Sequence, residues 1–423
     1  MEENHWYRTG LDHVWLPYAQ MKTMRPPLPV VRTEGCRIML ADGRELIDGV
    51  SSWWTACHGY NHPHIRAAVE RQLAQMPHVM LGGLVHEQAA VLARRLAALL
   101  PGGLERVFFS ESGSVAVEIA LKMAVQFWRN RGERGRTKFV AFKGGYHGDT
   151  TSAMAVSDPD AGFHDMFQGV LPEHFVVTLP TGEEAGAELE SVLRRHGGQV
   201  AALVVEPLVQ GAGGMRFHDA ATLKRIRAAA DRFGCLLIFD EIFTGFGRTG
   251  ALFACEASGV VPDIVTLSKA LTGGTLPLAA TVASRRVFEA FWSDDPAKAL
   301  MHGPTYTGNA LACAAAIASL DLFEREPRLQ QVAAISAQMA TDLAPCRALP
   351  RVKDVRVLGA IGAVEMERIG DIEAMRARFV EKGVFVRPFG NVVYLAPPFT
   401  IAPDELSLLT SAVLGIIEEG VAG

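Results

Sequence analysis

The sequence predicts an α/β protein with a mostly parallel main sheet. Short apolar runs alternate with helical stretches, as in strands joined by crossover helices. The runs are almost continuously apolar, which is typical of strands buried on both faces. The candidate strands are Val107–Ser110, Phe139–Phe142, Ala201–Val205, Leu236–Asp240 and Ile264–Ser268.

Two helices are expected between these strands, at Val115–Arg129 and Ala221–Phe233. In the first, apolar side chains recur at helical intervals from Val115 through Ile119 and Met123 to Phe127. A face of this kind should pack on the sheet.

The two chain ends have a different pattern. Residues 1–60 hold short β-like runs around an Asp-Gly hairpin signal. Residues 311–423 begin with an Ala-rich helix, followed by further short runs. These include a helix near Ile372–Lys382 and strands around Val384–Arg387 and Val392–Leu395. We expect a smaller α+β domain built from both termini, with residues 61–310 as the large domain.

Composition excludes several classes of protein. The 423 residues are 49% hydrophobic and 21% charged, an ordinary globular balance, and the net charge of −5 gives no basic footprint for nucleic acid. No apolar run approaches the roughly 20 residues of a membrane helix. The six cysteines are scattered, with neither zinc spacing nor a disulfide framework, and M-E-E-N-H-W-Y-R does not resemble a signal peptide. We therefore expect a reduced, cytoplasmic protein without a metal, nucleic-acid or membrane partner.

Asp240 and Lys269 indicate the chemistry. Asp240 ends the apolar run C-L-L-I-F-D-E, and Lys269 lies in the turn T-L-S-K-A-L-T-G-G after the next strand. Taken singly, the acid could be a helix cap and the lysine a solvated turn residue. Together they suit pyridoxal 5'-phosphate, which needs an amine for a Schiff base and a carboxylate to keep its ring nitrogen protonated.

Two glycine-containing segments suit the phosphate of such a cofactor. Gly113 and Ser114 open a helix after a strand, where free N–H groups and the helix dipole favour a dianion. The turn M-H-G-P-T-Y offers Gly303, Pro304 and Thr305. A plain N-cap serine and an ordinary turn are the structural alternatives.

Six further residues are candidates for the rest of the site. Tyr146, in G-G-Y-H-G-D-T, could stack on a flat ring, with His147 and Asp149 orienting it. Arg387, at a strand end before a proline, could clamp a carboxylate. Trp53 and Tyr18 could line a pocket. The structural alternatives are a packed aromatic side chain for Tyr146, Trp53 and Tyr18, and a surface arginine for Arg387.

These motifs together resemble the class III pyridoxal-phosphate-dependent aminotransferases of fold type I, over essentially the whole chain. D-E-I-F-T-G-F-G-R-T-G followed by L-S-K-A-L-T-G-G carries that resemblance. Within the family, D-G-V-S-S-W-W-T-A-C-H-G-Y-N-H-P, G-Y-H-G-D-T and M-H-G-P-T-Y resemble the adenosylmethionine-8-amino-7-oxononanoate aminotransferases of biotin synthesis.

The resemblance implies a role for each candidate. Lys269 would hold the cofactor and move the proton, and Asp240 would pair with the ring nitrogen. Gly113 and Ser114 would hold the phosphate, with Pro304 and Thr305 arriving from the second subunit of a homodimer. Substrates would be S-adenosylmethionine and 8-amino-7-oxononanoate. They would contact a shared set of residues: Tyr18, Trp53, Tyr146, Lys269, Gly303 and Arg387.

Departures from the family pattern leave the amino donor open. Leu16 stands where His is frequent, Thr307 where Met is common, and Leu276-Pro277-Leu278 matches the wider group. The alternatives are another class III ω-aminotransferase, a lysine-using diaminononanoate synthase, and a lyase or mutase of the same fold. A non-catalytic binding protein is a further alternative, although it would have no need of a Schiff-base lysine.

Overall fold

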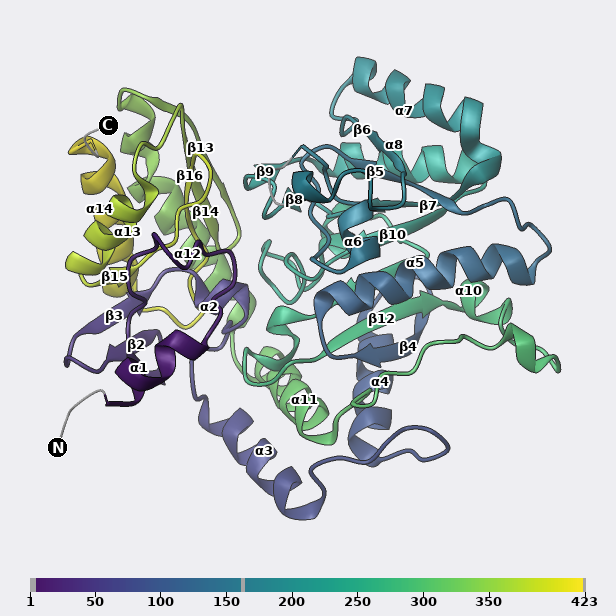
Figure 1. Cartoon of the computed structure of the whole chain (residues 1–423), viewed down its shortest axis with the longest axis horizontal. Coiled ribbons are helices and arrows are strands. Elements are labelled where there is room, and N and C mark those ends of the chain that lie inside the picture. Colours follow the sequence, from purple (N-terminus) through teal and green to yellow (C-terminus); the bar gives the residue numbers. More distant parts are fainter. Residues whose placement is uncertain (1–4, 161–163, 421–423) are drawn as a thin grey trace. The chain divides into compact units, whose positions relative to one another are not determined.

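The computed structural model describes residues 5–160 and 164–420, which form two compact units. The smaller unit is Met1–His62 with Ala333–Gly423, and the larger is Pro63–Val332 (Figure 1). A smaller domain made from both chain ends was expected. The divisions were expected at 60 and 310, and the units divide after His62 and after Val332. The helix α11 (Ala310–Arg325) packs within the larger unit, on α3 and α4.

The larger unit is built on a seven-stranded sheet in which only one strand is antiparallel to its neighbours. The strand order is β4 (Leu104–Ser110), β12 (Ala279–Ser284), β11 (Ile264–Leu267), β10 (Leu236–Asp240), β7 (Val200–Val205), β5 (Lys138–Phe142) and β6 (Phe175–Val177). The antiparallel strand is β12, which pairs with both β11 and β4. The prediction of a mostly parallel sheet is confirmed.

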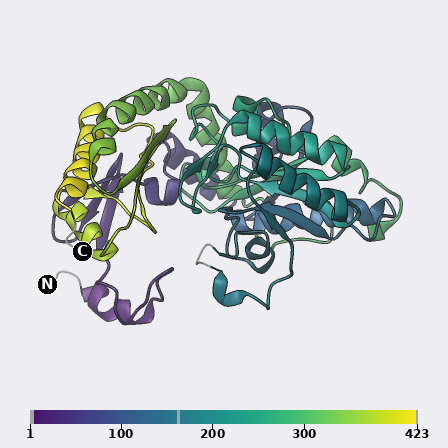
Figure 2. The same ribbon diagram turned by 90° about the horizontal axis from the view of Figure 1, so that it is seen from above.

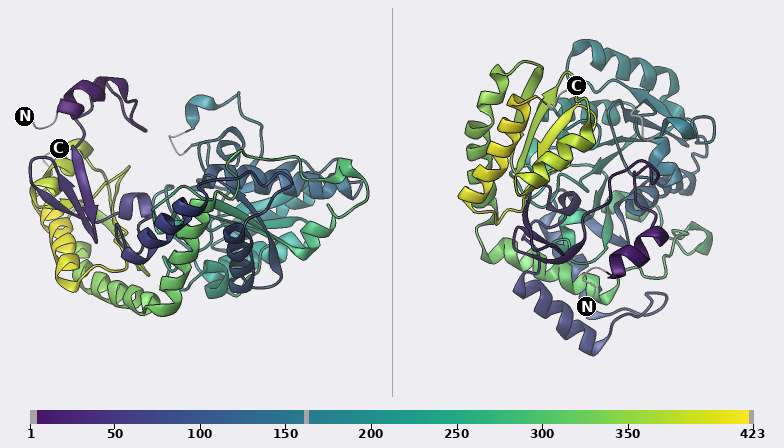
Figure 3. Two further views of the ribbon diagram at one scale, coloured as in Figure 1. Left: turned by 90° about the horizontal axis from the view of Figure 1, so that it is seen from below. Right: turned by 60° about the vertical axis from the view of Figure 1, so that its left-hand side comes forward.

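Helices of the larger unit pack on this sheet and on each other. The helix α5 (Gly113–Asn130) buries Ile119, Met123 and Phe127 against sheet residues such as Ile238, as its periodicity predicts. Besides α5 and α11, the α-helices described wholly within this unit are α3 (Pro63–Gln75), α4 (Glu87–Leu99), α6 (Thr151–Ala155), α7 (Glu183–His196), α8 (Ala220–Arg232), α9 (Ala254–Ser258) and α10 (Arg285–Glu289). The helices α3 and α11 lie side by side, as Figures 1 and 3 show from different directions.

The smaller unit contains two sheets. One has the order β1 (Val30–Glu34), β2 (Arg37–Leu40), β3 (Glu45–Asp48) and β15 (Val384–Phe385), and the other has β13 (Val352–Leu358), β14 (Ile361–Met366) and β16 (Val392–Leu395). Its helices are α1 (His5–Gly10), the short α2 (Ser51–Trp54), α13 (Ile372–Glu381) and α14 (Pro403–Glu418), and the boundary at Val332 falls within α12 (Arg328–Asp342).

Parallel pairing of β15 with β3 joins the two chain ends of the smaller unit. Val384 is in register with Ile47, so a C-terminal strand completes an N-terminal sheet. Figure 2 shows the purple N-terminal strands next to the yellow-green C-terminal elements of this unit. The expected hairpin is present, since β2 and β3 are antiparallel and Gly43 at the turn has φ of 87°. Within the described residues, no helix has the length and hydropathy required to span a membrane.

The glycine-rich loop at Gly213 supplies a stability test. A Cβ at Gly213 would lie 1.6 Å from the carbonyl oxygen of Gly144, so Gly213→Ala must displace backbone. We expect it to lower the free energy of unfolding by about 1–3 kcal/mol in urea titrations. Gly186→Ala is the control, because Gly186 lies inside α7 with open space around it. There the added methyl should stabilise by roughly 0.5–1 kcal/mol. Equal effects of the two substitutions would contradict this packing.

Candidate active site

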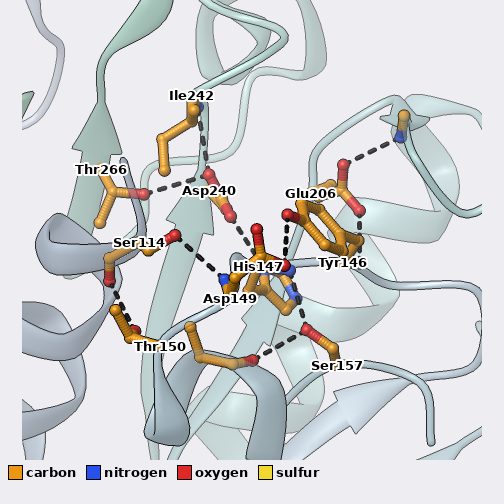
Figure 4. Close-up of polar contacts among 12 residues, drawn as sticks. Ser114, Tyr146, His147, Asp149, Thr150, Ser157, Glu206, Asp240, Ile242 and Thr266 are labelled. Atoms are coloured by element: carbon orange, nitrogen blue, oxygen red, sulfur yellow. Dashed lines mark hydrogen bonds and ion pairs between the residues drawn. The ribbon is translucent and has the colours of Figure 1, made fainter. Parts of the chain in front are cut away.

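Strand ends bring the candidate residues of the larger unit together. The strands β4, β5, β7, β10 and β11 all run in one direction, so their carboxyl ends lie along one edge of the sheet. Ligands of open α/β sheets bind outside this edge. The residues that follow these strands include Ser114, Tyr146, Glu206, Asp240 and Lys269. Figure 4 shows the polar contacts among the first four and their neighbours.

Asp240, the last residue of β10, is buried and makes contacts through both carboxylate oxygens. His147 Nδ1 lies 2.8 Å from Oδ2, while Oδ1 accepts hydrogen bonds from Ile242 N at 3.1 Å and Thr266 Oγ1 at 3.2 Å (Figure 4). Burial by itself lowers the pKa of His147. The hydrogen bond and the charge of Asp240 outweigh that effect, so the pKa is raised. The contact with His147 fixes the orientation of Asp240.

Glu206 is a second buried acid at the same edge, and sequence analysis gave it no role. It follows β7, and its Oε1 accepts from Tyr146 N at 3.0 Å while Oε2 accepts from Gly211 N at 2.9 Å. Burial raises the pKa of Glu206 to about 7. Its signal was present in the run A-A-L-V-V-E-P, which ends in an acid as the Asp240 run does.

Lys269 follows β11 and begins a short 3₁₀ turn, Lys269–Thr272. Its φ of 46° is left-handed, a conformation that costs a non-glycine residue roughly 1–2 kcal/mol and often marks a functional position. The residue keeps some exposure to solvent. Burial lowers the pKa of Lys269 to about 8, against the charges of Asp240, Glu206 and Asp149, which raise it. A sizeable neutral fraction at physiological pH makes this amine a nucleophile and a base.

The start of α5 forms a closely packed cradle. Ser112 caps the helix by accepting from Val115 N at 3.4 Å, and Ser114 Oγ accepts from Asp149 N at 3.1 Å. A Cβ at Gly148 would lie 2.2 Å from Ser114 Oγ, and one at Gly113 would lie 2.9 Å from an Ile242 methyl. The backbone here approaches its neighbours too closely for side chains. The first-turn N–H groups of a helix have no intrahelical partner and suit a phosphate.

Tyr146 is held by two neighbours. Its hydroxyl donates to Asp149 Oδ1 at 2.9 Å, and its ring stacks on that of His164, with centroids 5.7 Å apart and an interplanar angle of 20°. The Nε2 of His164 lies 3.4 Å from the same Asp149 oxygen. Sequence analysis missed His164, because a single histidine 18 residues after Tyr146 belongs to no motif that would indicate a contact between the two.

Three candidates of the smaller unit form a cluster of their own. The rings of Tyr18 and Trp53 meet edge to face with centroids 6.5 Å apart, and Arg387 Cζ lies 5.3 Å from the Trp53 ring centroid. Burial and the positive charge of Arg376 lower the pKa of Arg387. A guanidinium whose ordinary pKa exceeds about 12 stays charged after such a shift, so the cluster combines aromatic surface with a fixed positive charge.

The segment Gly303–Thr305 is not joined to Ser114 by a hydrogen bond among residues 5–160 and 164–420. Gly303 and Thr305 are exposed, and the preceding residues are tied to α5 by Lys122 Nζ, which donates to Met301 O at 2.7 Å. No group of three or more His, Cys, Asp or Glu in the described part of the chain could hold a metal ion.

The lowered pKa of Lys269 can be measured directly. After reductive ¹³C-methylation of protein stripped of bound small molecules, the Lys269 resonance, identified by its loss in Lys269→Arg, should titrate near pH 8. Surface lysines should titrate near 10.4. Asp240→Asn should lower the pKa of Lys269 further, because the Asp240 charge raises it. Titration of Lys269 with the surface lysines would contradict this electrostatic environment.

Comparison with known proteins agrees with the site. The family model described as "Aminotransferase class-III" matches residues 18–417. The adenosylmethionine-8-amino-7-oxononanoate aminotransferase of Mycobacterium leprae is 45% identical over 96% of this chain and 94% of its own.

Solved structures give the same result. The enzyme of that name from Methanocaldococcus jannaschii superposes with a TM-score of 0.95 at 33% identity, over 99% of this chain and 100% of its own. An amine transaminase of an uncultivated Pseudomonas species, in its PLP-bound form, gives 0.88 at 33% identity, over 95% and 97%. Together with the acid and lysine at the sheet edge, these matches show that the chain belongs to the class III aminotransferases, which depend on pyridoxal phosphate.

Proposed function

We propose that this enzyme transfers the amino group of S-adenosylmethionine to 8-amino-7-oxononanoate, giving 7,8-diaminononanoate for biotin synthesis in a ping-pong reaction. The observation that carries the proposal is the near full-length similarity to relatives that bear these substrates in their names. The Trp53–Arg387 cluster supports it, because a long keto acid needs both apolar surface and a partner for its carboxylate.

The residues at the sheet edge fit the cofactor. The cradle of Gly113 and Ser114 would hold its phosphate, Asp240 would hold the proton at its ring nitrogen, and Tyr146 would lie over the ring. When bound, pyridoxal phosphate supplies an electron-withdrawing ring that accepts the electron pair of a substrate C–H bond. His147 would hold Asp240 in the required orientation through the 2.8 Å contact.

Lys269 would carry the proton in both halves of the reaction. Its neutral amine would take the proton from the amine-bearing carbon of the donor, and its protonated form would later deliver one to the acceptor's carbonyl carbon. A pKa of about 8 places both forms within reach near neutral pH. Asp240, Glu206 and Asp149 stabilise the protonated form between the two transfers.

The two substrates would use the same contacts in turn. Arg387 would bind one carboxylate with its planar fork, and Trp53 and Tyr18 would offer flat surface to an aliphatic chain or to the adenosyl group. The family resemblance implies that Gly303 would also contact substrate. The exposed edges of Trp53 and Tyr18 are consistent with such a role, since 42% and 55% of these residues are accessible to solvent.

Separate half-reactions test this assignment. S-adenosylmethionine alone should bleach the yellow cofactor absorbance of the purified enzyme, and 8-amino-7-oxononanoate should restore it. Arg387→Ala should raise the KM of both carboxylate substrates, whereas Trp53→Ala should weaken the two half-reactions unequally. If lysine bleaches the absorbance and S-adenosylmethionine does not, the amino donor is lysine and the proposed donor is wrong. Failure of 8-amino-7-oxononanoate to restore the colour would favour the ω-aminotransferase alternative.

We also propose that the enzyme is a homodimer. The segments 76–86 and 301–309 lie together, since Asn309 Nδ2 donates to Pro77 O at 3.2 Å and the rings of His78 and Tyr306 are 4.6 Å apart. They expose a group of large apolar side chains: Met80, Leu84, Val85, Met301 and Tyr306. An apolar surface of this kind marks an interface. It adjoins Thr305, so a partner bound there could receive Pro304 and Thr305 at its phosphate site.

We place the reaction in the cytoplasm. All six cysteines lie within the described residues, and each is buried and free of disulfides. Six buried cysteines that form no disulfide are typical of a reducing compartment.

Subunit mixing tests the shared site. Lys269→Ala and Thr305→Ala homodimers should both be weak, yet a hybrid regains one site with Lys269 from one chain and Thr305 from the other. Random mixing at equal amounts makes half of the dimers hybrid, so activity should recover to about a quarter of wild type. Mixing Lys269→Ala with the Lys269→Ala/Thr305→Ala double variant is the control and should recover none. No recovery in the first mixture would contradict sharing of Thr305.

A further inference from the structure

The segment Ser51–Trp54 has an unusual backbone. Its four residues, none of them glycine, have φ values of 49°, 46°, 57° and 72°, all in the left-handed region. Only isolated residues normally adopt this conformation, because the Cβ then approaches the carbonyl oxygen. A run of four persists only if surrounding contacts hold it.

Asp48, at the end of β3, supplies those contacts. Its side chain is fully buried, with Oδ1 accepting from Val50 N at 2.8 Å and Oδ2 accepting from Ser52 N at 2.9 Å. The Tyr60 hydroxyl donates to the same Oδ2 at 2.5 Å and also contacts Ser52 Oγ. Both carboxylate oxygens therefore accept hydrogen bonds from backbone N–H groups at the start of the turn.

The turn sends two adjacent tryptophans into different surroundings. Trp54 is buried, with its ring 6.1 Å from that of Tyr394, while Trp53 is 42% exposed and lies beneath the Arg387 guanidinium. Neighbouring aromatic side chains in a regular strand would also diverge. Here, however, the direction of Trp53 depends on left-handed backbone that Asp48 fixes.

We propose that Asp48 is a positioning residue for substrate, holding Trp53 against Arg387 through the Ser51–Trp54 turn. The inference rests on the proposed function for the statement that Trp53 contacts substrate. The alternative is that Asp48 only stabilises the smaller unit. The two differ in one respect, since a positioning residue loses its effect on substrate once Trp53 is removed.

A double-mutant cycle separates these alternatives. Asp48→Asn keeps the size of the side chain but replaces one acceptor oxygen with an NH₂ group, so the hydrogen bond from either Val50 N or Ser52 N is lost. We expect the KM for 8-amino-7-oxononanoate to rise about tenfold, with kcat nearly unchanged and cofactor absorbance intact. In a Trp53→Ala background, Asp48→Asn should cause little further rise in this KM. Additive effects on KM would overturn the proposal.

A direct readout of Trp53 is independent of the substrates. In protein labelled with 5-fluorotryptophan, six ¹⁹F resonances are expected, and the Trp53 signal is the one absent from Trp53→Phe. Asp48→Asn should shift or broaden this signal far more than the signals of tryptophans in the larger unit. An unchanged Trp53 signal would overturn the proposal even if 8-amino-7-oxononanoate proves not to be the acceptor.

Two further variants guard against misfolding. Tyr60→Phe removes one donor to Asp48 and should move the Trp53 signal in the same direction, with about a threefold rise in KM. Asp371→Asn is the matched control, because Asp371 caps α13 in the same unit by accepting from Ala374 N at 2.9 Å. It should lower stability and leave both the Trp53 signal and the KM unchanged. If Asp371→Asn reproduces the Asp48→Asn changes, the proposal fails.

Discussion

Parallel pairing of β7, β10 and β11 is the constraint on which the site depends. Because these strands run in one direction, the residues just after them lie along one edge of the sheet. Glu206, Asp240 and Lys269 are 63 residues apart along the chain at most, yet they share that edge. The apolar strands are buried on both faces, and this burial creates the low-polarity surroundings in which charges at the edge interact strongly.

The electrostatics of the edge follow from that burial. Burial lowers the pKa of Lys269 and the charges of the surrounding acids raise it, which leaves the pKa at about 8. Asp240 is held through His147, Ile242 and Thr266, and Glu206 through the backbone of Tyr146 and Gly211. Each acid therefore orders a loop as well as contributing charge. The loop that carries Tyr146 and His147 is held by Glu206 and Asp240, the same acids that raise the pKa of Lys269.

Sequence reasoning succeeded where pattern and chemistry coincide. Asp240 and Lys269 end apolar runs, and the helix from Gly113 follows a strand, so the sheet edge could be predicted. β12 was missed because the run A-A-T-V-A-S carries little strand signal; pairing with β4 and β11 on both sides holds it. The left-handed run at Ser51–Trp54 was also missed, because serine and tryptophan give no indication of positive φ.

The structure gives contacts at two of the three departures from the family pattern, Thr307 and the segment around Pro277. Thr307 donates through Oγ1 to Phe109 O at 2.7 Å, which ties the 301–309 segment to the end of β4. Next to Pro277, the carbonyl of Leu278 accepts from Ser268 Oγ at 2.8 Å, beside Lys269. Nothing in the structure explains Leu16.

The central claim is that Lys269 is the amine that binds pyridoxal phosphate at this edge. Borohydride reduction of the purified yellow enzyme, followed by proteolysis and mass spectrometry, tests it most directly. The account predicts a pyridoxyl-phosphate adduct on Lys269. An adduct confined to any other lysine would contradict it.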